Sequence, residues 1–334
     1  MTAATFDGWV PIRLGWRDAE PYVDWCRIGE NRFTEPFFSG TIDRCLRHPF
    51  TLMFRRETPL EELGRWREAR PGIRPTGFIF HVSRCGSTLV SRMLGALPGS
   101  IMLSEPGPVD DVLRSHWKHP STSDQQRVEW LRGMVSALGQ PRGGGESRLF
   151  IKFDAWSLVD LPIIRAAFPE TPAVFLYRDP VEVLVSHMRS RGMHMVPGMV
   201  EPEMFGMSGK EAASLPPLDY CGRVLARLFD LGVAACRCGQ AVPLNYSQLP
   251  GAVESILLRS FGLTCTPEEG KTLEGVARFD AKNPGFIFED DTERKNREVS
   301  ELIRECAEKW VVPLYQELEA IRAGGSPRPQ GASP

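Results

Sequence analysis

The sequence has no apolar run that approaches the roughly 18–20 residues of a membrane-spanning helix. It also lacks an amino-terminal basic segment followed by an apolar core, so we expect no signal peptide and no membrane span. Basic residues are not in excess, since 40 lysines and arginines face 42 aspartates and glutamates. Because no local basic patch of useful length occurs either, we expect no nucleic-acid partner. These absences together predict a soluble, cytoplasmic protein.

The eight cysteines do not form a metal-binding pattern. Only Cys236 and Cys238 are close together, and a Cys-x-Cys pair inside an expected helix lacks the spacing of a zinc site. In a chain this long, scattered cysteines are interpreted as reduced thiols, and no metal site is expected.

The 334 residues are enough for one large α/β domain with an extension. Residues 1–76 are rich in Trp and Arg without a regular strand rhythm. We expect there a mostly helical or irregular extension, with a helix over 17–26, packed on the main domain so that its tryptophans are buried. Residues 77–322 alternate short β-branched runs with longer helical patterns, which predicts a three-layer domain with a parallel sheet flanked by helices. The Gly/Pro/Ser-rich tail 323–334 is expected to be disordered.

Five segments are predicted as strands of the parallel sheet. They share a short apolar run bounded by polar or turn residues: 77–82, 101–103, 149–153, 173–177 and 241–245.

An anion-binding loop is predicted directly after the first of these strands. The apolar run that begins at Phe78 ends in Ser83-Arg-Cys-Gly-Ser-Thr88, and a helical pattern begins at once with Leu89 and Val90. A strand, a tight loop of small residues and a helix N-terminus present backbone N–H groups and positive potential to an anion. Arg84 and the two hydroxyls add further donors. We therefore expect a ligand with a phosphate or sulfate group.

This loop departs from the form found in nucleotide hydrolases. That form requires Gly-x4-Gly-Lys-Ser/Thr, in which the Lys contacts the terminal phosphates and the hydroxyl binds magnesium. No Lys precedes the hydroxyls here. A loop that binds phosphate without positioning a metal fits better.

A second strand–turn–helix segment repeats the pattern further along the chain. Arg178 follows an apolar run, Asp179-Pro180 is a favourable helix start, and Ser186 lies two helical turns beyond. Arg178 and Ser186 could bind a second phosphate, because ligands of open α/β sheets bind at the carboxyl ends of the strands. The alternative is a salt bridge at the helix start and an exposed helical serine.

The two segments together resemble the sulfotransferase family, whose members use 3′-phosphoadenylyl sulfate (PAPS) and release 3′-phosphoadenosine 5′-phosphate (PAP). The resemblance extends over about 77–321 and implies the P-loop fold of that family. It implies that Arg84, Cys85, Gly86, Ser87 and Thr88 contact the 5′-phosphosulfate, and that Arg178 and Ser186 contact the 3′-phosphate. Arg before Cys-Gly-Ser-Thr looks most like the tyrosylprotein sulfotransferase branch and its bacterial relatives.

Four more positions match that branch. Glu105 matches its catalytic Glu, Lys152 a Lys near the sulfuryl group, and Tyr246 an aromatic residue near the nucleotide. Lys295 or Lys282 could supply a late basic residue that lines the donor. Two positions depart from the pattern, since Cys85 replaces the usual Ser and Ser87 the first of two Thr residues.

The chemistry of sulfuryl transfer agrees with these residue types. Negative charge grows on the bridging oxygen in the transition state, where Arg84 and Lys152 can stabilise it. Glu105 is then the available general base for the acceptor hydroxyl. Each residue also has a structural interpretation: Glu105 could cap a helix near Pro108, Lys152 could simply end a strand, and Tyr246 could be ordinary packing. His187 and His194 are interpreted as surface or loop residues.

The sequence therefore predicts a sulfotransferase that acts on a hydroxyl or amine of a small-molecule or peptide acceptor. A small-molecule P-loop kinase and a catalytically silent nucleotide-binding module are the alternatives. Residues 1–76 and the Met-rich stretch 192–217 are the expected determinants of acceptor specificity.

Overall fold

The structure, a computed structural model, describes residues 6–279 and 299–324. Contacts divide the chain into two compact units. The first unit contains 1–78, 90–171 and 266–277, and the second contains 79–89, 172–265 and 278–334. The predicted division at residues 76 and 322 remains a prediction.

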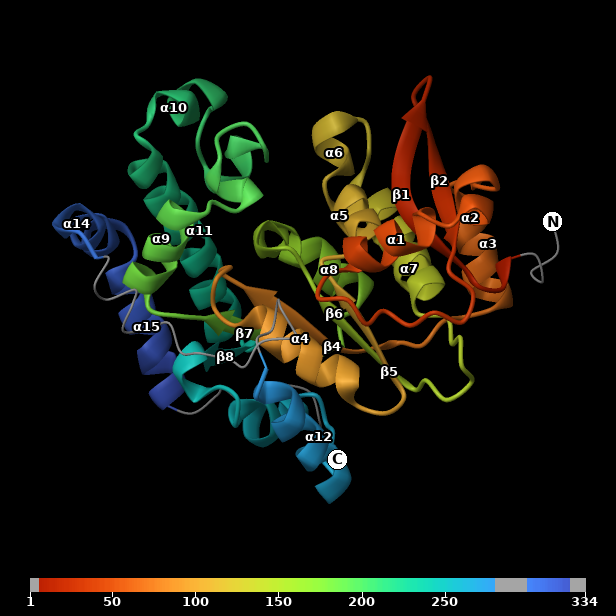
Figure 1. Cartoon of the computed structure of the whole chain (residues 1–334). Coiled ribbons are helices and arrows are strands. Elements are labelled where there is room, and N and C mark those ends of the chain that lie inside the picture. The colour runs from red at the N-terminus through yellow and green to blue at the C-terminus, as the bar shows by residue number, and fades with distance from the viewer. Residues whose placement is uncertain (1–5, 280–298, 325–334) are drawn as a thin grey trace. The chain divides into compact units, whose positions relative to one another are not determined.

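The first unit combines a small antiparallel sheet with helices and with two strands of the main sheet. Its strands are β1 (Trp9–Arg17), β2 (Glu20–Arg27), β3 (Arg56–Pro59), β5 (Ser100–Ser104) and β6 (Arg148–Lys152). Its helices are α1 (Phe38–Leu46), α2 (Pro49–Met53), α3 (Glu62–Ala69), α5 (Gly107–Leu113), α6 (Ser115–Lys118), α7 (Asp124–Leu138), η2 (Ala155–Asp160), α8 (Leu161–Ala167) and α12 (Pro267–Ala277). In Figure 1, α5 and α7 lie against β1, as their contacts also show.

The expected helix over 17–26 is wrong, because these residues form the turn and second strand of a hairpin. β1 and β2 pair antiparallel, with Arg17 opposite Glu20, and β3 extends this sheet on the other side of β2. Asp18 and Ala19 form the turn with φ of 49° and 67°. Positive φ at both central residues matches the twist of a tight hairpin, but Asp-Ala is a weaker turn signal than Asn-Gly. The extension therefore contains a three-stranded sheet.

The second unit is built around one long helix. Its elements are β7 (Ala173–Tyr177), α9 (Pro180–Arg189), η3 (Met193–Met195), η4 (Pro202–Phe205), α10 (Gly209–Ser214), α11 (Pro217–Arg237), β8 (Val242–Asn245), η5 (Tyr246–Gln248), η6 (Val253–Leu258), α14 (Glu301–Trp310) and α15 (Val312–Ala323). Helix α11 packs against α9, α14 and α15, and it lies beside α9 in Figure 1. At Gly232 of α11 a Cβ would lie 2.1 Å from the ring of Phe175, so only glycine allows this close approach to β7.

Two elements cross the boundary between the units, namely β4 (Pro75–His81) and α4 (Ser87–Ala96). The main sheet has the strand order β5-β6-β4-β7-β8, with parallel pairing in β5–β6 and β7–β8. All five predicted strands are present, and the α/β fold class with a parallel sheet flanked by helices is confirmed. From β4 the chain passes first to the edge strand β5 and then back to β6, which lies between them, and on the other side of β4 it runs outward through β7 to β8.

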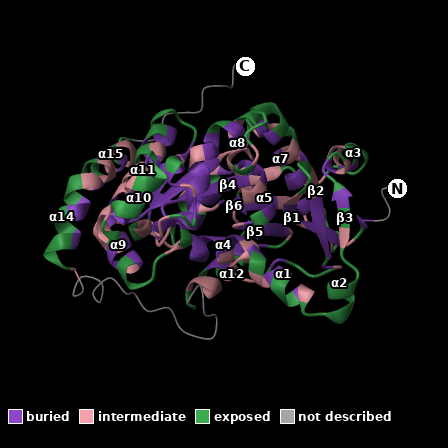
Figure 2. Cartoon of the chain, turned by 90° about the horizontal axis from the view of Figure 1, so that it is seen from above, coloured by how far each residue is buried: buried purple, intermediate pink, exposed green. Residues whose placement is uncertain are grey.

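The strands of the main sheet supply much of the core. Every residue of β5 and β7 is buried, as are Phe78, Ile79 and Phe80 in β4. Figure 2 shows buried residues along the strands and exposed ones on outer helices such as α2 and α14. This near-continuous apolar character is typical of parallel strands covered on both faces.

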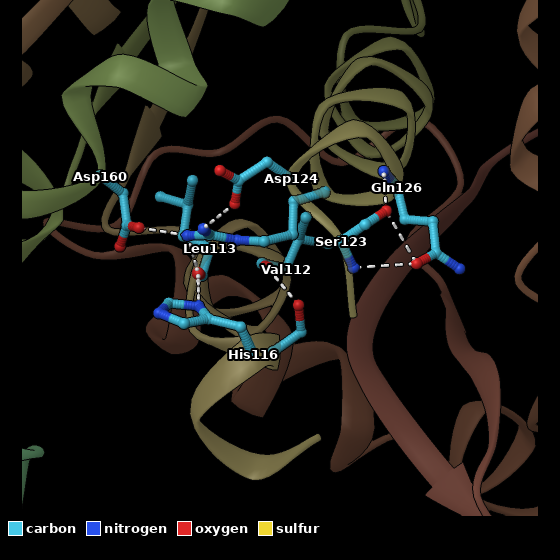
Figure 3. Close-up of polar contacts among 9 residues, drawn as sticks. Val112, Leu113, His116, Ser123, Asp124, Gln126 and Asp160 are labelled. Atoms are coloured by element: carbon cyan, nitrogen blue, oxygen red, sulfur yellow. Dashed lines mark hydrogen bonds and ion pairs between the residues drawn. The ribbon is translucent and has the colours of Figure 1, made fainter. Parts of the chain in front are cut away.

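Helix α7 begins at a cluster of polar contacts in the first unit (Figure 3). Ser123 and Gln126 form a capping box, which satisfies backbone N–H groups of the first turn. Arg127, whose side chain is 5% exposed, forms an ion pair with Asp160 and donates to the Leu113 carbonyl. Burial raises the pKa of Asp160 to about 6, while the Arg127 cation opposes that rise. The pair joins α7 to the segment before α8.

No helix among the residues that the structure describes is long and apolar enough to cross a membrane.

Candidate functional site

The loop at 83–88 connects β4 to α4 in a strained backbone conformation. Ser83 and Arg84 have φ of 67° and 54°, and Gly86 has φ of 82°. Non-glycine residues avoid this left-handed region unless the surrounding structure enforces it, and such strain concentrates at ligand sites. Turns of this type expose successive N–H groups as an anion-binding concavity, and α4 begins directly after it at Ser87. The predicted strand–loop–helix arrangement is therefore present.

Contacts within the second unit hold this loop against β7. The Leu176 carbonyl of β7 accepts a hydrogen bond from the Val82 N–H at 3.2 Å and from the Cys85 thiol at 3.3 Å. Cys85 is fully buried, so its side chain anchors the loop and only its backbone could contact an anion. The Arg84 guanidinium donates to the Ser190 carbonyl at 2.6 Å, just beyond α9, and burial lowers its pKa.

The Tyr246 ring lies against both Arg178 of the second predicted phosphate site and Gly86 of the loop at 83–88. The Arg178 guanidinium lies 3.8 Å from the centre of the Tyr246 ring, and it also forms an ion pair with Glu182. A Cβ on Gly86 would lie 2.8 Å from an atom of the same Tyr246 ring. Tyr246 therefore contacts both segments that the sequence predicted to bind phosphate, and only glycine fits beneath its ring.

Helix α9 begins as its sequence predicts. The Asp179 carboxylate accepts hydrogen bonds from the N–H groups of Val181 and Glu182, and Pro180 occupies the first turn. Ser186 lies on α9 and is half-buried. The Arg178–Glu182 ion pair is the salt bridge at the helix start that the sequence offered as the alternative role of Arg178.

Glu105 and Lys152 are brought together in the first unit. Lys152 Nζ lies 2.7 Å from Glu105 Oε1, and the lysine side chain is 0% exposed while that of Glu105 is 27% exposed. Lys152 ends β6 opposite Ser104 of β5, and the Glu105 N–H donates to the Lys152 carbonyl at 2.7 Å. The ring of Phe37 lies 4.9 Å from the same ammonium. A fully buried lysine is rare unless it is paired, and here Glu105 and the Phe37 ring fix the position of the Lys152 ammonium.

Glu105 itself has a φ of 53°. Of the five non-glycine residues with positive φ in the described part of the chain, two form the β1–β2 turn and the others are Ser83, Arg84 and Glu105. Backbone strain outside the hairpin therefore falls on Ser83 and Arg84 of the loop and on Glu105, which is paired with Lys152.

The sequence analysis missed Asp154, which follows Lys152 by two residues. Burial raises the pKa of its carboxyl well above the ordinary value, and the negative charges of Asp110 and Glu105 add to that rise. Asp110 forms an ion pair with Arg114 at 3.1 Å and accepts a hydrogen bond from the Trp156 indole at 2.7 Å. A polar residue at the carboxyl end of a buried strand was the available signal for Asp154.

Other predicted residues have different outcomes. Ser87 and Thr88 are buried at the start of α4. Lys295 and Lys282 lie outside the described residues.

The surface interpretation of His187 and His194 is wrong, because both side chains are buried and their rings pack edge to face with centroids 5.5 Å apart. Among the described residues, no group of His, Cys, Asp and Glu is arranged to bind a metal ion.

The Met-rich stretch 192–217 contains three short helical segments, η3, η4 and α10. Met195, Met204 and Met207 are at most 2% exposed, whereas Met193 and Met199 are 43% and 55% exposed. Three of its five methionines therefore belong to the core of the second unit.

No protein-family model matches the chain, and no curated protein matches its sequence. Among solved structures it is similar to a sulfotransferase from Alicyclobacillus acidocaldarius, with a TM-score of 0.42 and 15% identity over 75% of this chain and 96% of that one. A sulfotransferase domain from the curacin biosynthetic pathway has a TM-score of 0.40 and 17% identity over 76% and 97%. A sulfotransferase from Mycobacterium tuberculosis H37Rv has 0.39 and 16% over 71% and 81%. At this level of similarity, we base the function on this chain's own residues.

Proposed function

We propose that this chain transfers a sulfuryl group from PAPS to a hydroxyl or amine of an acceptor. The observation that most supports the proposal is the meeting of two strand–loop–helix segments at Tyr246, which contacts Arg178 and leaves room only for glycine at position 86. One segment offers a backbone anion site at a helix N-terminus, and the other a buried guanidinium. A donor with a phosphosulfate and a separate phosphate requires two such sites.

The residues of the second unit fit the donor. The loop 83–86, with positive φ at Ser83, Arg84 and Gly86, and the N-terminus of α4 would bind the phosphosulfate, with Arg84 as an added cation. Arg178, supported by the Tyr246 ring, and Ser186 would bind the 3′-phosphate. Arg178 is paired with Glu182 and their formal charges cancel, so a 3′-phosphate would compete with Glu182 for the guanidinium.

The Glu105–Lys152 pair of the first unit fits the chemistry of transfer. When bound, PAPS supplies the sulfuryl group and accepts the electron pair of the broken S–O bond on its phosphate oxygen. Glu105 takes the proton of the acceptor hydroxyl through its partly exposed carboxylate. Lys152 places a fixed, desolvated positive charge beside that carboxylate, which stabilises negative charge that grows in the transition state. The acceptor oxygen forms the new bond to sulfur as the old S–O bond breaks.

Calorimetry with PAP tests donor binding directly. Wild-type protein should bind PAP without magnesium, and Arg178→Ala should bind about 10- to 100-fold more weakly, because charge-assisted hydrogen bonds to phosphate are lost. Glu182→Gln is the matched control, since it breaks the same ion pair but leaves the guanidinium in place. It should bind PAP at least as tightly as wild type.

Three outcomes would contradict the proposal. Wild-type protein that does not bind PAP rejects the donor, and magnesium-dependent binding of ATP in its place favours a kinase. Equal losses of affinity in Arg178→Ala and Glu182→Gln would mean that the ion pair only supports the fold. If PAP binds but no labelled sulfuryl group moves to any phenol, alcohol, amine or peptide, the chain is a silent binding module.

A further inference from the structure

A pocket in the first unit is not explained by donor binding. It has a volume of about 190 Å³ and is lined by the segment 33–36, the second half of α4, the end of β5 and Val276 of α12. Phe33, Ala96 and Met102 give it an apolar interior. Its charged lining residues are one carboxylate, Glu35, and one guanidinium, Arg92, whose formal charges cancel. The lining therefore favours an uncharged occupant.

The pocket also contains a buried hydroxyl that lacks a partner. Ser104 is 3% exposed and lines the pocket, and its Oγ has no hydrogen-bond partner among the described residues. Buried polar groups are nearly always hydrogen-bonded, because an unsatisfied one retains its full desolvation cost. A ligand with a hydroxyl group in the pocket would satisfy Ser104.

Two walls of the pocket continue into the Glu105–Lys152 pair. On β5, Met102 and Ser104 lie on one face of the sheet, and Glu105 is the next residue. Lys152 is the register partner of Ser104 on β6, and register partners present their side chains on the same face. The segment 33–36 continues into Phe37, whose ring contacts the Lys152 ammonium. An occupant of the pocket would therefore lie beside the residues to which acceptor chemistry is assigned.

We propose that this pocket binds the body of the acceptor, which is a small uncharged alcohol or phenol no larger than a single six-membered ring. This inference rests on the proposed function. The size follows from the volume, because a cavity of about 150 Å³ lined by apolar side chains accommodates one benzene molecule. The polar group bound by Ser104 orients the ring, and the pocket excludes fused-ring compounds and carboxylates.

Ligand-observed NMR titrations test the pocket, with phenol and cyclohexanol as probes and benzoate and 2-naphthol as compounds that should not bind. Ser104→Ala should weaken phenol binding about fivefold through the loss of one hydrogen bond. Ser100→Ala is the matched control, because Ser100 is also a buried serine of β5 whose Oγ lacks a partner among the described residues, but it does not line the pocket. It should leave phenol affinity within about twofold of wild type.

Ala96→Phe and Val276→Phe fill the pocket from two different helices and should each abolish phenol binding. Calorimetry with PAP on the same variants should give wild-type affinity, which shows that the fold and the donor site are intact. Phenol binding that survives both substitutions overturns the inference, as does equal weakening by Ser104→Ala and Ser100→Ala or preferential binding of benzoate or 2-naphthol. Failure of wild-type protein to bind PAP would reject the proposed donor and leave the phenol result standing by itself.

Discussion

Lys152 offers the most direct test of the catalytic assignment. Its side chain is fully buried and its ammonium lies 2.7 Å from Glu105. Lys152→Met keeps most of the volume and removes the charge. If the ammonium stabilises charge in the transition state, kcat should fall about 10²- to 10³-fold, the loss typical of one preorganised donor, or roughly 3–4 kcal/mol.

The effect on stability should be smaller than the effect on catalysis. Breaking a buried ion pair costs about 3–5 kcal/mol when the remaining charge is left without solvent. Glu105 is 27% exposed, so water can solvate its carboxylate, and methionine packs well in the space of the lysine. We therefore expect a loss of about 1–2 kcal/mol in urea unfolding, below the range for a fully buried pair.

The assay separates the two contributions. Initial rates of labelled sulfuryl transfer at saturating PAPS give kcat, calorimetry gives the PAP affinity, and urea unfolding gives the free energy of unfolding. Lys210→Met, which neutralises an exposed lysine of α10, is the matched control and should change none of these by more than about 0.5 kcal/mol. A fall in kcat of less than tenfold would refute the assignment of Lys152, and so would a loss of PAP affinity as large as the loss of kcat.

Three further predictions concern the loop at 83–88, the pH dependence of stability, and the buried Arg127–Asp160 pair. Gly86→Ala should weaken PAP binding at least about tenfold in calorimetry, because Gly86 has a φ of 82° and the new Cβ would lie 2.8 Å from the Tyr246 ring. Unchanged PAP affinity would contradict the claim that only glycine fits at this position. Burial raises the pKa of Asp111 to about 6, so ionisation of its carboxyl opposes folding. As the pH rises from about 4 to about 6, the free energy of unfolding of the wild type should fall by up to about 3 kcal/mol relative to that of Asp111→Asn. Parallel pH profiles of the two proteins in urea unfolding would show that Asp111 does not oppose folding. Arg127→Leu should cost about 3–5 kcal/mol in the same measurement because it leaves Asp160 buried without its cation, and a loss below about 1 kcal/mol would show that the pair is dispensable.

Local sequence signals were reliable where the chain's own chemistry set the structure. Asp179-Pro180 predicts the start of α9 because a carboxylate cap and a proline favour a first turn in any context. The place of the loop before α4 is also a local signal, since polar and small residues separate a buried strand from an amphipathic helix, but the positive φ of Ser83 and Arg84 is not. The hairpin of β1 and β2 was missed because its turn contains no glycine or asparagine, and its stability comes from packing of both strands.

Partners that are distant in the chain could not be derived from sequence patterns. Tyr246 meets Arg178 and Gly86 only because the β-strands bring three separate segments to the same edge of the sheet. Asp154 follows a strand that the sequence predicts, but the raised pKa of its carboxyl depends also on the charges of Asp110 and Glu105, which its neighbours in the sequence do not report.

The sequence by itself determined the α/β class, the strand–loop–helix segment at 83–88 and the separate positions of Arg178, Glu105 and Lys152, because these depend on local periodicity and on the chemistry of each side chain. Only the tertiary structure decided that Lys152 is fully buried against Glu105 and Phe37, and that Ser104 lines a ring-sized pocket without a partner among the described residues. The physical reason is that burial and pairing depend on which strands are neighbours and in which register, and the β5–β6 register joins residues almost fifty positions apart.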